Sequence, residues 1–374
     1  MKIFICGPTL YERCHIGHAR IFIFFNFLIN FHRFIGDWPI AILQLTDIDH
    51  KIYQKDYPNS INIANISDKF LSFLFEDLNN IQVEKNFIYS RVSNFLSLIK
   101  SDVIGILNSK KGYMYAGNVY LKITGDIASP FGLDLNDIDN MPIDISCGKS
   151  KQRDIMIWNS ENFYQEYKKK DDEGNNEIYK RILTSGIPGW HFQDHEIIKN
   201  VFNGDYDMHG GARELLYPHH EFIDEISKKI NENSKMLYKK KWLHIGLVNI
   251  NSEKMSNSTG NTVSISNILK TYNPNTLKLY FLSKNYKTDI EFSNQDLDKA
   301  NEHDKNITSF LLEDKNCFHP NENIDKPIIK RFLSFLYDDY DTASALELIL
   351  QVLDKTRNSL LIGRMLEILG LKYY

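Results

Sequence analysis

The first 45 residues constrain the fold most, because two short apolar runs enclose one long apolar run. Lys2 to Cys6 is a β-like run that Gly7-Pro8 breaks, and a helical stretch follows from Ile16 to Gly36. Ile40 to Leu45 is a second β-like run. A strand, a helix and a strand in this space predict a right-handed βαβ unit of a parallel sheet. We therefore expect an α/β fold whose turn residues lie at the carboxyl edge, where such sheets bind ligands.

The chain of 374 residues is long enough for two or three units. Residues 1–84 and 186–300 are expected to form a Rossmann-like catalytic domain with a parallel sheet, including a strand near Trp242 to Val248. Residues 85–185 are expected to be a connective insertion, with a helix near Val92 to Leu107, a strand at Asn118 to Ile123 and an irregular polar span from Lys149 to Asn176.

Residues 301–374 are expected to form a C-terminal helical domain after a polar linker between Asp314 and Lys326. Apolar residues recur there at three- and four-residue intervals, which is the pattern of an amphipathic helix. They are Ala345, Leu346, Ile349, Leu350 and Leu353.

Charge and cysteine content limit the classes of function. The formal net charge is −4, so binding of a nucleic acid would need a local basic surface, for which the lysine runs 168–170 and 239–241 are candidates. Such runs are more often solvated faces. The four cysteines show no paired spacing, which favours a reducing, cytoplasmic compartment. The most apolar stretch, Ile21 to Ile35, contains polar residues and is too short to span a membrane, and we see no leader sequence.

The turn after the first β-like run contains His15-Ile16-Gly17-His18, and a lysine loop, Lys254-Met255-Ser256, lies far downstream. Two imidazoles at a helix N-terminus and a remote ammonium group suit binding of a polyphosphate, since helix N-termini favour anions. Donors aimed at developing charge typically contribute ~3 to 4 kcal/mol each to a transition state. The combination predicts nucleotidyl transfer, in which a small carboxylic acid attacks the α-phosphate of ATP. Either motif alone is weak, because two capping histidines or an exposed turn would give the same letters.

Seven motifs over nearly the whole chain extend this pattern. In this order they resemble those of the cysteinyl-tRNA synthetases, which are class I enzymes. The motifs are Cys6-Gly7-Pro8-Thr9, His15 to His18, Thr46-Asp47-Ile48-Asp49, Pro188-Gly189-Trp190-His191, His209-Gly210-Gly211, Pro218-His219-His220-Glu221 and Lys254-Met255-Ser256.

The resemblance implies a monomeric cysteine–tRNA ligase that adenylates cysteine with ATP and Mg²⁺ and then charges a tRNA. His15, His18 and Lys254 are implied to be catalytic. The implied ATP-binding residues are Gly7, Thr9, Gly17, Asp207, His209, Gly210, Lys254, Met255 and Ser256. The implied amino-acid pocket consists of Cys6, Thr46, Trp190 and His219.

Family members select cysteine with a zinc ion, and this sequence departs from their ligand pattern. Cys6 and His219 occupy two of the four ligand positions, but Asp194 stands at the second cysteine position and Ile223 at the glutamate position. Two alternatives stay open: Cys6, Asp194 and His219 form a three-ligand zinc site, or the metal is lost. His195 or Glu225 is a substitute ligand if the backbone shifts.

Two further departures keep other functions open. Asn257 replaces a second lysine of the loop, and the chain ends soon after the helical part, without the small anticodon-reading tail of many relatives. One alternative is a ligase that passes the aminoacyl adenylate to an amine, as in the mycothiol pathway. Another is a catalytically weakened paralogue with changed amino-acid specificity. A third is a regulatory or RNA-binding module that keeps the fold and has lost turnover.

Overall fold

The computed structural model describes residues 1–56, 63–115, 117–123, 129, 131, 154–160, 186–230, 240–255, 260–313, 322–353, 355 and 358–373. Within these residues, five strands form a parallel sheet in the order β3-β2-β1-β8-β9. They are β1 (Lys2–Ile5), β2 (Ile40–Leu45), β3 (Ile88–Arg91), β8 (Met208–Ala212) and β9 (Lys241–Ile245). The expected parallel sheet and the βαβ unit at its start are confirmed.

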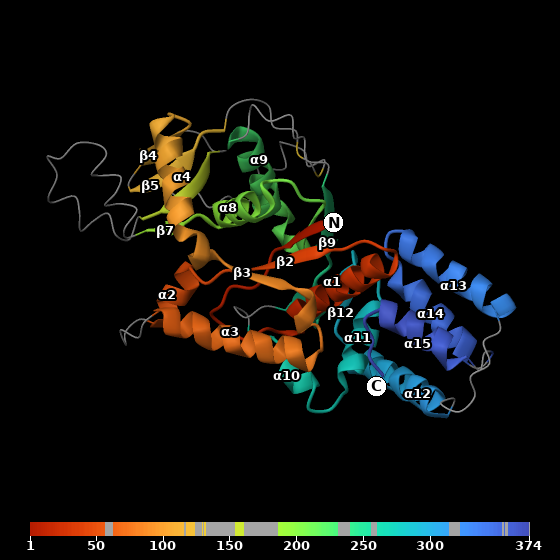
Figure 1. Cartoon of the computed structure of the whole chain (residues 1–374). Coiled ribbons are helices and arrows are strands. Elements are labelled where there is room, and N and C mark those ends of the chain that lie inside the picture. Colours follow the sequence, from red (N-terminus) through yellow and green to blue (C-terminus); the bar gives the residue numbers. More distant parts are fainter. Residues whose placement is uncertain are drawn as a thin grey trace, which may run out of the picture.

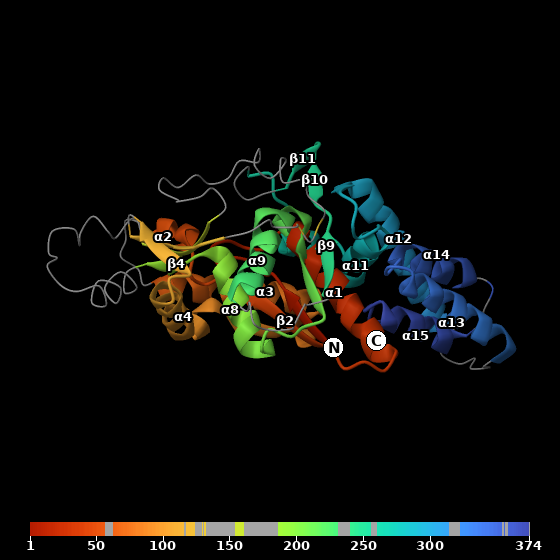
Figure 2. The same cartoon turned by 90° about the horizontal axis from the view of Figure 1, so that it is seen from above.

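The two faces of this sheet are buried by different parts of the chain, as Figures 1 and 2 show. Ile3 and Ile5 of β1 pack in a core with α1 (Ile16–Phe34) and α3 (Ile63–Asn80), whereas Phe4 packs in a second core with residues of the insertion. This alternation follows from the two-residue period of a strand. Helix α1 is buried along most of its length and ends before Gly36, whose φ is +95°, as the sequence predicted.

A second, antiparallel sheet lies beside α4 in Figure 1, away from the C-terminal helices. Its strand order is β4-β5-β6-β7. One strand, β6, falls inside the span that we expected to be irregular, because the apolar run IMIWN was overlooked among its charged neighbours. The strands of this sheet are β4 (Gly112–Tyr115), β5 (Asn118–Leu121), β6 (Ile155–Asn159) and β7 (Ile187–Pro188). The helices near them in the sequence are η2 (Val92–Phe95), α4 (Leu96–Asn108), α8 (Trp190–Phe202) and α9 (Glu221–Ile230).

The boundaries expected from the sequence need adjustment in three places. β3 pairs with β2, so a break at residue 84 would separate this strand from its sheet. The strand expected near Trp242 to Val248 is two strands, β9 and β10 (Val248–Ile250), because Gly246 and Leu247 carry the chain into a small sheet with β11 (Glu253–Lys254) and β12 (Ile290–Glu291). The helical part begins at α11 (Pro274–Leu282) rather than at residue 301. The division into domains otherwise stays a prediction.

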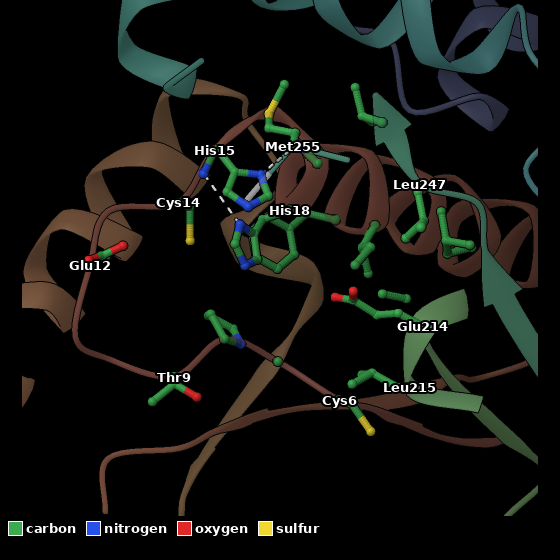
Figure 3. Close-up of a pocket in the computed structure, with 18 of the residues that line it drawn as sticks. Cys6, Thr9, Glu12, Cys14, His15, His18, Glu214, Leu215, Leu247 and Met255 are labelled. Carbon is green, nitrogen blue, oxygen red and sulfur yellow. Dashed lines mark hydrogen bonds between the residues drawn. The ribbon is translucent and has the colours of Figure 1, made fainter. Parts of the chain in front are cut away.

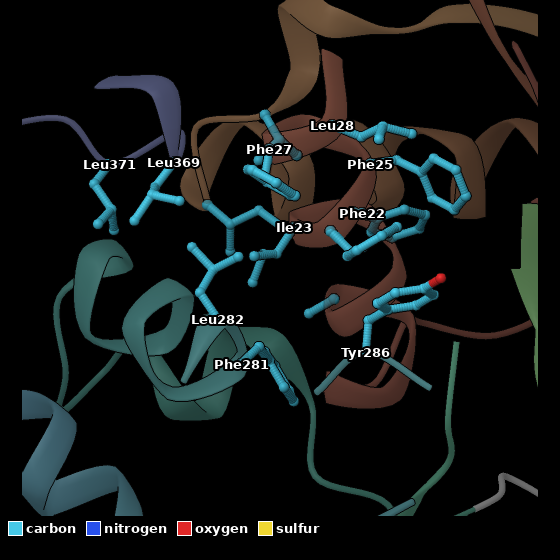
Figure 4. Packing of buried hydrophobic residues seen from close by; sticks show 14 of the residues in the cluster. Phe22, Ile23, Phe25, Phe27, Leu28, Phe281, Leu282, Tyr286, Leu369 and Leu371 are labelled. Atoms are coloured by element: carbon cyan, nitrogen blue, oxygen red, sulfur yellow. The ribbon is translucent and has the colours of Figure 1, made fainter. Parts of the chain in front are cut away.

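The C-terminal helices pack against α1. This helix therefore contacts both the parallel sheet and the helical part. Figure 4 shows Phe22, Ile23 and Phe27 of α1 near Leu282 and Leu369. The predicted amphipathic helix is α14 (Thr342–Leu353), one of the four that follow α11. The others are α12 (Asn294–Glu313), α13 (Glu322–Tyr337) and α15 (Ser359–Ile368).

The remaining short helices connect these parts. They are α2 (His50–Asp56), η1 (Glu84–Asn86), η3 (Arg213–Leu215), η4 (Leu216–His220) and α10 (Ile265–Ile268). Among the helices that the structure describes, none combines the length and the apolar composition needed to cross a membrane.

Candidate active site

His15 and His18 cap the N-terminus of α1 with their Nδ1 atoms. The backbone N–H of Gly17 donates to Nδ1 of His15 at 3.1 Å, and the backbone N–H of His15 donates to Nδ1 of His18 at 3.3 Å. Because each Nδ1 accepts a hydrogen bond, a neutral ring must carry its proton on Nε2. The pair, with ring centroids 4.1 Å apart, thus offers two Nε2–H donors beside a helix N-terminus.

Burial keeps both imidazoles neutral. It lowers the pKa of His15 to about 4, with a smaller contribution from the positive charge of Lys254. Burial also lowers the pKa of His18 well below its usual value, and His15 and Lys254 add to this shift. At neutral pH the two rings therefore donate hydrogen bonds without adding charge.

Gly17 is required for this capping arrangement. A Cβ at residue 17 would lie 2.8 Å from Cε1 and 2.9 Å from Nδ1 of the His15 ring. The resemblance implied that Gly17 is an ATP-binding residue. The structure gives a separate reason for glycine here, which is that the ring of His15 folds back over this residue.

Arg20 connects the histidine turn to the segment that carries Lys254. Its guanidinium group is buried and donates to the carbonyl oxygens of Gly246 at 2.7 Å and Leu247 at 3.0 Å. On the other side of the Lys254 segment, the backbone N–H of Ile16 donates to the carbonyl oxygen of Val263 at 2.9 Å. These bonds hold both ends of the segment against the first turns of α1.

Lys254 lies in β11, and its ammonium group forms an ion pair with Glu214. Burial lowers the pKa of Lys254, and the nearby charge of Lys51 lowers it further. Both members of the ion pair are partly exposed. The lysine is thus held at the mouth of the site by a contact that solvent weakens.

One cavity of about 550 Å³ brings the histidines and the lysine together. Figure 3 shows His15 and His18 at one end of this cavity and Cys6 toward the other. Most of the residues that we expected from the sequence line it. These are Cys6, Gly7, Thr9, His15, Gly17, His18, Trp190, Lys254 and Met255.

Six expected residues that the structure describes do not line the cavity, and two of them, Asp194 and His219, lie in the cluster around Cys6. Asp207 precedes β8 at the amino edge of the sheet, where it accepts a hydrogen bond from the backbone N–H of Lys2 at 2.6 Å. Gly210 is buried, and a Cβ there would lie 1.9 Å from the Phe25 ring of α1. His209 and Thr46 are fully buried beneath the site. We therefore assign no direct ATP contact to Asp207, His209 or Gly210, and Ser256 lies outside the described residues.

The expected lysine patch at 239–241 is not an exposed basic surface where the structure describes it. Lys240 is buried with its ammonium group 3.0 Å from a carboxylate oxygen of Asp224. Lys241 lies 3.4 Å from Asp339. Lys239 and the run 168–170 lie outside the described residues.

Cys6 is the centre of a buried cluster at the far end of the cavity. Its Sγ lies 3.1 Å from Oδ2 of Asp194, 3.7 Å from Nε2 of His219 and 3.3 Å from Nε2 of both His209 and His220. Burial, followed by the charge of Asp194, raises the pKa of the Cys6 thiol well above its usual value. The cluster joins the expected three ligands with two histidines that we had not considered as ligands.

The donor atoms of this cluster fit a transition-metal ion. Among the described residues, two sets of three have ligand atoms within 4.8 Å of one another: Cys6, Asp194 and His219, and Cys6, His209 and His220. Thiolate and imidazole are ligands that zinc prefers. His195 and Glu225, which the sequence suggested as substitute ligands, belong to neither set of three. Nδ1 of His195 instead lies 3.0 Å from the hydroxyl of Ser227.

Comparison with known proteins identifies the family. The family model described as "tRNA synthetases class I (C) catalytic domain" matches residues 1–302. The chain belongs to the class I aminoacyl-tRNA synthetases. The members of this family are ligases that use ATP, an amino acid and tRNA.

Relatives and a solved structure agree with this assignment. The cysteine–tRNA ligase of Blochmanniella pennsylvanica is 27% identical over 372 residues, which covers 96% of this chain and 75% of the relative. The cysteine–tRNA ligase of Thermoplasma volcanium is 31% identical over 311 residues, which covers 80% of this chain and 64% of the relative. The methionyl-tRNA synthetase of Mycobacterium tuberculosis in complex with methionyl-adenylate shares the fold with a TM-score of 0.62 at 12% identity, covering 98% of this chain and 89% of that one.

Sequence reasoning missed two residues that this class I synthetase places in its site region. Lys51 lines the cavity, and His220 faces Cys6. Lys51 lies two residues after Asp49 of a quoted motif, and His220 lies inside the quoted motif Pro218 to Glu221, where no role was given to it. The proximity was visible in the sequence, but only the tertiary structure orients these side chains.

Proposed function

We propose that this synthetase is a cysteine–tRNA ligase. A carboxylate oxygen of cysteine attacks the α-phosphorus of ATP, the bond to pyrophosphate breaks, and cysteinyl-adenylate forms. A hydroxyl of the terminal tRNA ribose then attacks the carbonyl carbon and AMP leaves. The observation that carries the proposal is the single cavity shared by His15, His18, Lys254 and Cys6. The names of the relatives favour this reaction over transfer to an amine.

The histidines and the lysine act on the phosphates. The Nε2–H groups of His15 and His18 donate to phosphate oxygens, where they stabilise charge that grows as the bond to pyrophosphate breaks. Lys254 leaves Glu214 and pairs with the pyrophosphate portion, since a phosphate offers it more negative charge. The loop then releases pyrophosphate as Lys254 returns.

The other end of the cavity receives the amino acid. Trp190 lies there, stacked on His219 with ring centroids 4.7 Å apart, and Cys6 lies beside them. Cys6 would hold a metal ion with either Asp194 and His219 or His209 and His220. A bound zinc ion supplies a soft Lewis acid that prefers the thiol of cysteine to the hydroxyl of serine. A pocket without such a contact discriminates by only ~1 to 3 kcal/mol for one small group.

Lys51 compensates for Asn257, the residue that stands in place of the second lysine of the loop. Lys51 lines the same cavity as Lys254, and its charge acts on Lys254. The ammonium group of Lys51 would pair with the pyrophosphate portion from α2, whereas the missing lysine would have done so from the loop that follows Lys254. The monomeric state and the cytoplasmic location stay predictions from the sequence.

The test is ATP–pyrophosphate exchange with cysteine, serine and alanine, followed by charging of tRNA with cysteine. We expect exchange with cysteine at least 100-fold more efficient than with serine, a factor that corresponds to about 2.7 kcal/mol. Equal exchange with serine would contradict the substrate. Exchange without tRNA charging would favour an amine as acceptor, and no exchange with any amino acid would favour a regulatory module.

A further inference from the structure

We infer that this chain binds a divalent transition-metal ion such as Zn²⁺ through Cys6, His209 and His220. This set differs from Cys6, Asp194 and His219, to which the motif positions point. The two sets share only the thiolate of Cys6. The inference does not depend on the proposed reaction, because metal binding is measured without ATP, cysteine or tRNA.

The distances within the set suit a tetrahedral ion. Zinc binds sulfur at ~2.3 Å and imidazole nitrogen at ~2.0 to 2.1 Å, which places these ligand atoms about 3.5 Å apart in a tetrahedron. Nε2 of His209 and Nε2 of His220 both lie 3.3 Å from Sγ of Cys6. In the other set the two separations from Sγ are unequal, at 3.1 Å to Asp194 and 3.7 Å to His219. An ion therefore enters the histidine set with smaller displacements of its ligands.

Both histidines of the set are oriented by a partner at their other nitrogen. Nδ1 of His209 lies 2.9 Å from the hydroxyl of Tyr206, and Nδ1 of His220 lies 2.8 Å from Nε2 of His244. When Nδ1 donates to such a partner, the lone pair of Nε2 is free for a metal. This is the outer-shell arrangement that fixes ligating histidines in metal sites.

Asp194 and His219 are hydrogen-bonded to each other. Nε2 of His219 lies 3.0 Å from Oδ2 of Asp194, and the Cys6 thiol donates to the same oxygen. The position that would complete a site around them holds Ile223, whose buried side chain packs in the same hydrophobic core as Cys6. Oδ2 of Asp194 already accepts two hydrogen bonds, so a metal at this atom would have to displace both donors, while Oδ1 of Asp194 is buried without a hydrogen-bond partner.

Gly211 leaves space beside the proposed ligands. A Cβ at this residue would lie 3.3 Å from Cβ of Cys6 and 3.3 Å from Nε2 of His220, which is tighter than ordinary van der Waals contact. The missing side chain therefore keeps open the region next to a ligand nitrogen. His209 and His220 are themselves fully buried, so an ion there is shielded from water.

The experiment measures zinc and cobalt binding by the full chain and four variants. We expect His209→Gln and His220→Gln to lower the affinity for Zn²⁺ by on the order of 100-fold or more, because loss of an outer-shell partner alone costs 10- to 100-fold. Asp194→Asn and His219→Gln are the matched controls and should change the affinity less than tenfold. Circular dichroism establishes that each variant is folded.

X-ray absorption of the zinc-loaded unaltered protein gives a readout that needs no variant. The inference expects one sulfur and the outer-shell scattering of two imidazole rings, whereas the set with Asp194 has one ring. One ring in this spectrum would overturn the inference. So would loss of zinc in folded Asp194→Asn or His219→Gln, or an unaltered protein that takes up no stoichiometric zinc when one equivalent is supplied.

Discussion

Five histidines of this chain form two groups, the cavity pair (His15 and His18) and the thiol cluster (His209, His219 and His220), and the two groups differ in what occupies Nδ1. In the cavity pair, Nδ1 accepts a backbone hydrogen bond, so Nε2 carries the proton and donates into the cavity. In the thiol cluster, Nδ1 of His209 and Nδ1 of His220 each have a side-chain partner, which leaves their Nε2 atoms able to face Cys6 as acceptors, whereas Nε2 of His219 faces the carboxylate of Asp194. The same side chain therefore suits an anion in one place and a metal ion in the other.

The comparison teaches that sequence spacing identifies the first group and not the second. His15 and His18 meet because they lie three residues apart at the start of one helix. His209 and His220 come from a strand and from the short helix η4, and they meet at Cys6 only because β8 lies beside β1. A local group can be predicted from the chain, whereas the second group depends on the sheet.

The largest effect is expected for His18→Ala. Loss of one fixed donor should lower kcat of ATP–pyrophosphate exchange by ~100- to 1000-fold, while zinc content stays unchanged. His303→Ala, in α12 and away from the cavity, is the control and should retain exchange. A fall in zinc content with His18→Ala would show that the two groups are not independent.

Lys51→Met should lower kcat about tenfold, which corresponds to ~1.4 kcal/mol, because one cation would be lost from the pyrophosphate side. The exposed Lys69, which does not line the cavity, provides the control Lys69→Met. Steady-state exchange kinetics at saturating cysteine measure the change. Equal rates for Lys51→Met and the unaltered protein would mean that Lys51 does not replace the missing lysine.

Glu214→Gln should have a smaller effect on the same side of the cavity. The ion pair with Lys254 holds the lysine away from substrate, and pairs of this exposure contribute ~0.2 to 1 kcal/mol. We expect the KM for ATP to fall by up to about fivefold. An increase in this KM would instead indicate that Glu214 itself contacts ATP.

Lys254→Met should raise the pKa of His15 from about 4 toward its usual value, because one of the two causes of the shift is removed. Burial is the larger cause and stays, so the change should be modest. Titration of the imidazole by NMR measures it. An unchanged pKa would place Lys254 too far from His15 to share a phosphate with it.

The same shift sets a direction for stability against pH. The unfolded chain takes up a proton at His15 near pH 6.5, whereas the folded chain does so near pH 4. The contribution of this group to the free energy of unfolding is therefore complete above pH 6.5 and decreases as the pH falls toward 4. Urea unfolding at pH 7 and at pH 5 measures this effect. The free energy of unfolding should decrease less between pH 7 and pH 5 for His15→Asn than for the unaltered protein.

Much of the fold was predictable from local pattern. The apolar run from Ile16 and the glycine at 36 gave the bounds of α1, and the spacing from Ala345 to Leu353 gave α14. The predictions were wrong where apolar runs were short, as at β3 and β6. A strand of a few residues is stabilised mainly by the strand that it pairs with, and this pairing is not visible in a short stretch of sequence. Asp207, which the resemblance implied to be an ATP-binding residue, lies off the cavity for a related reason, since the motif specified its neighbours in the sequence and not its edge of the sheet.

The sequence by itself determined the α/β order of elements, the histidine turn of α1 and the membership of Cys6 and Lys254 in one site. These features rest on local spacing and on motif order. Only the tertiary structure decided that Lys51 reaches the cavity and that His209 and His220 surround a thiol more than 200 residues earlier in the chain. The physical reason is that pairing of parallel strands, driven by burial of both sheet faces, brings distant residues to one edge.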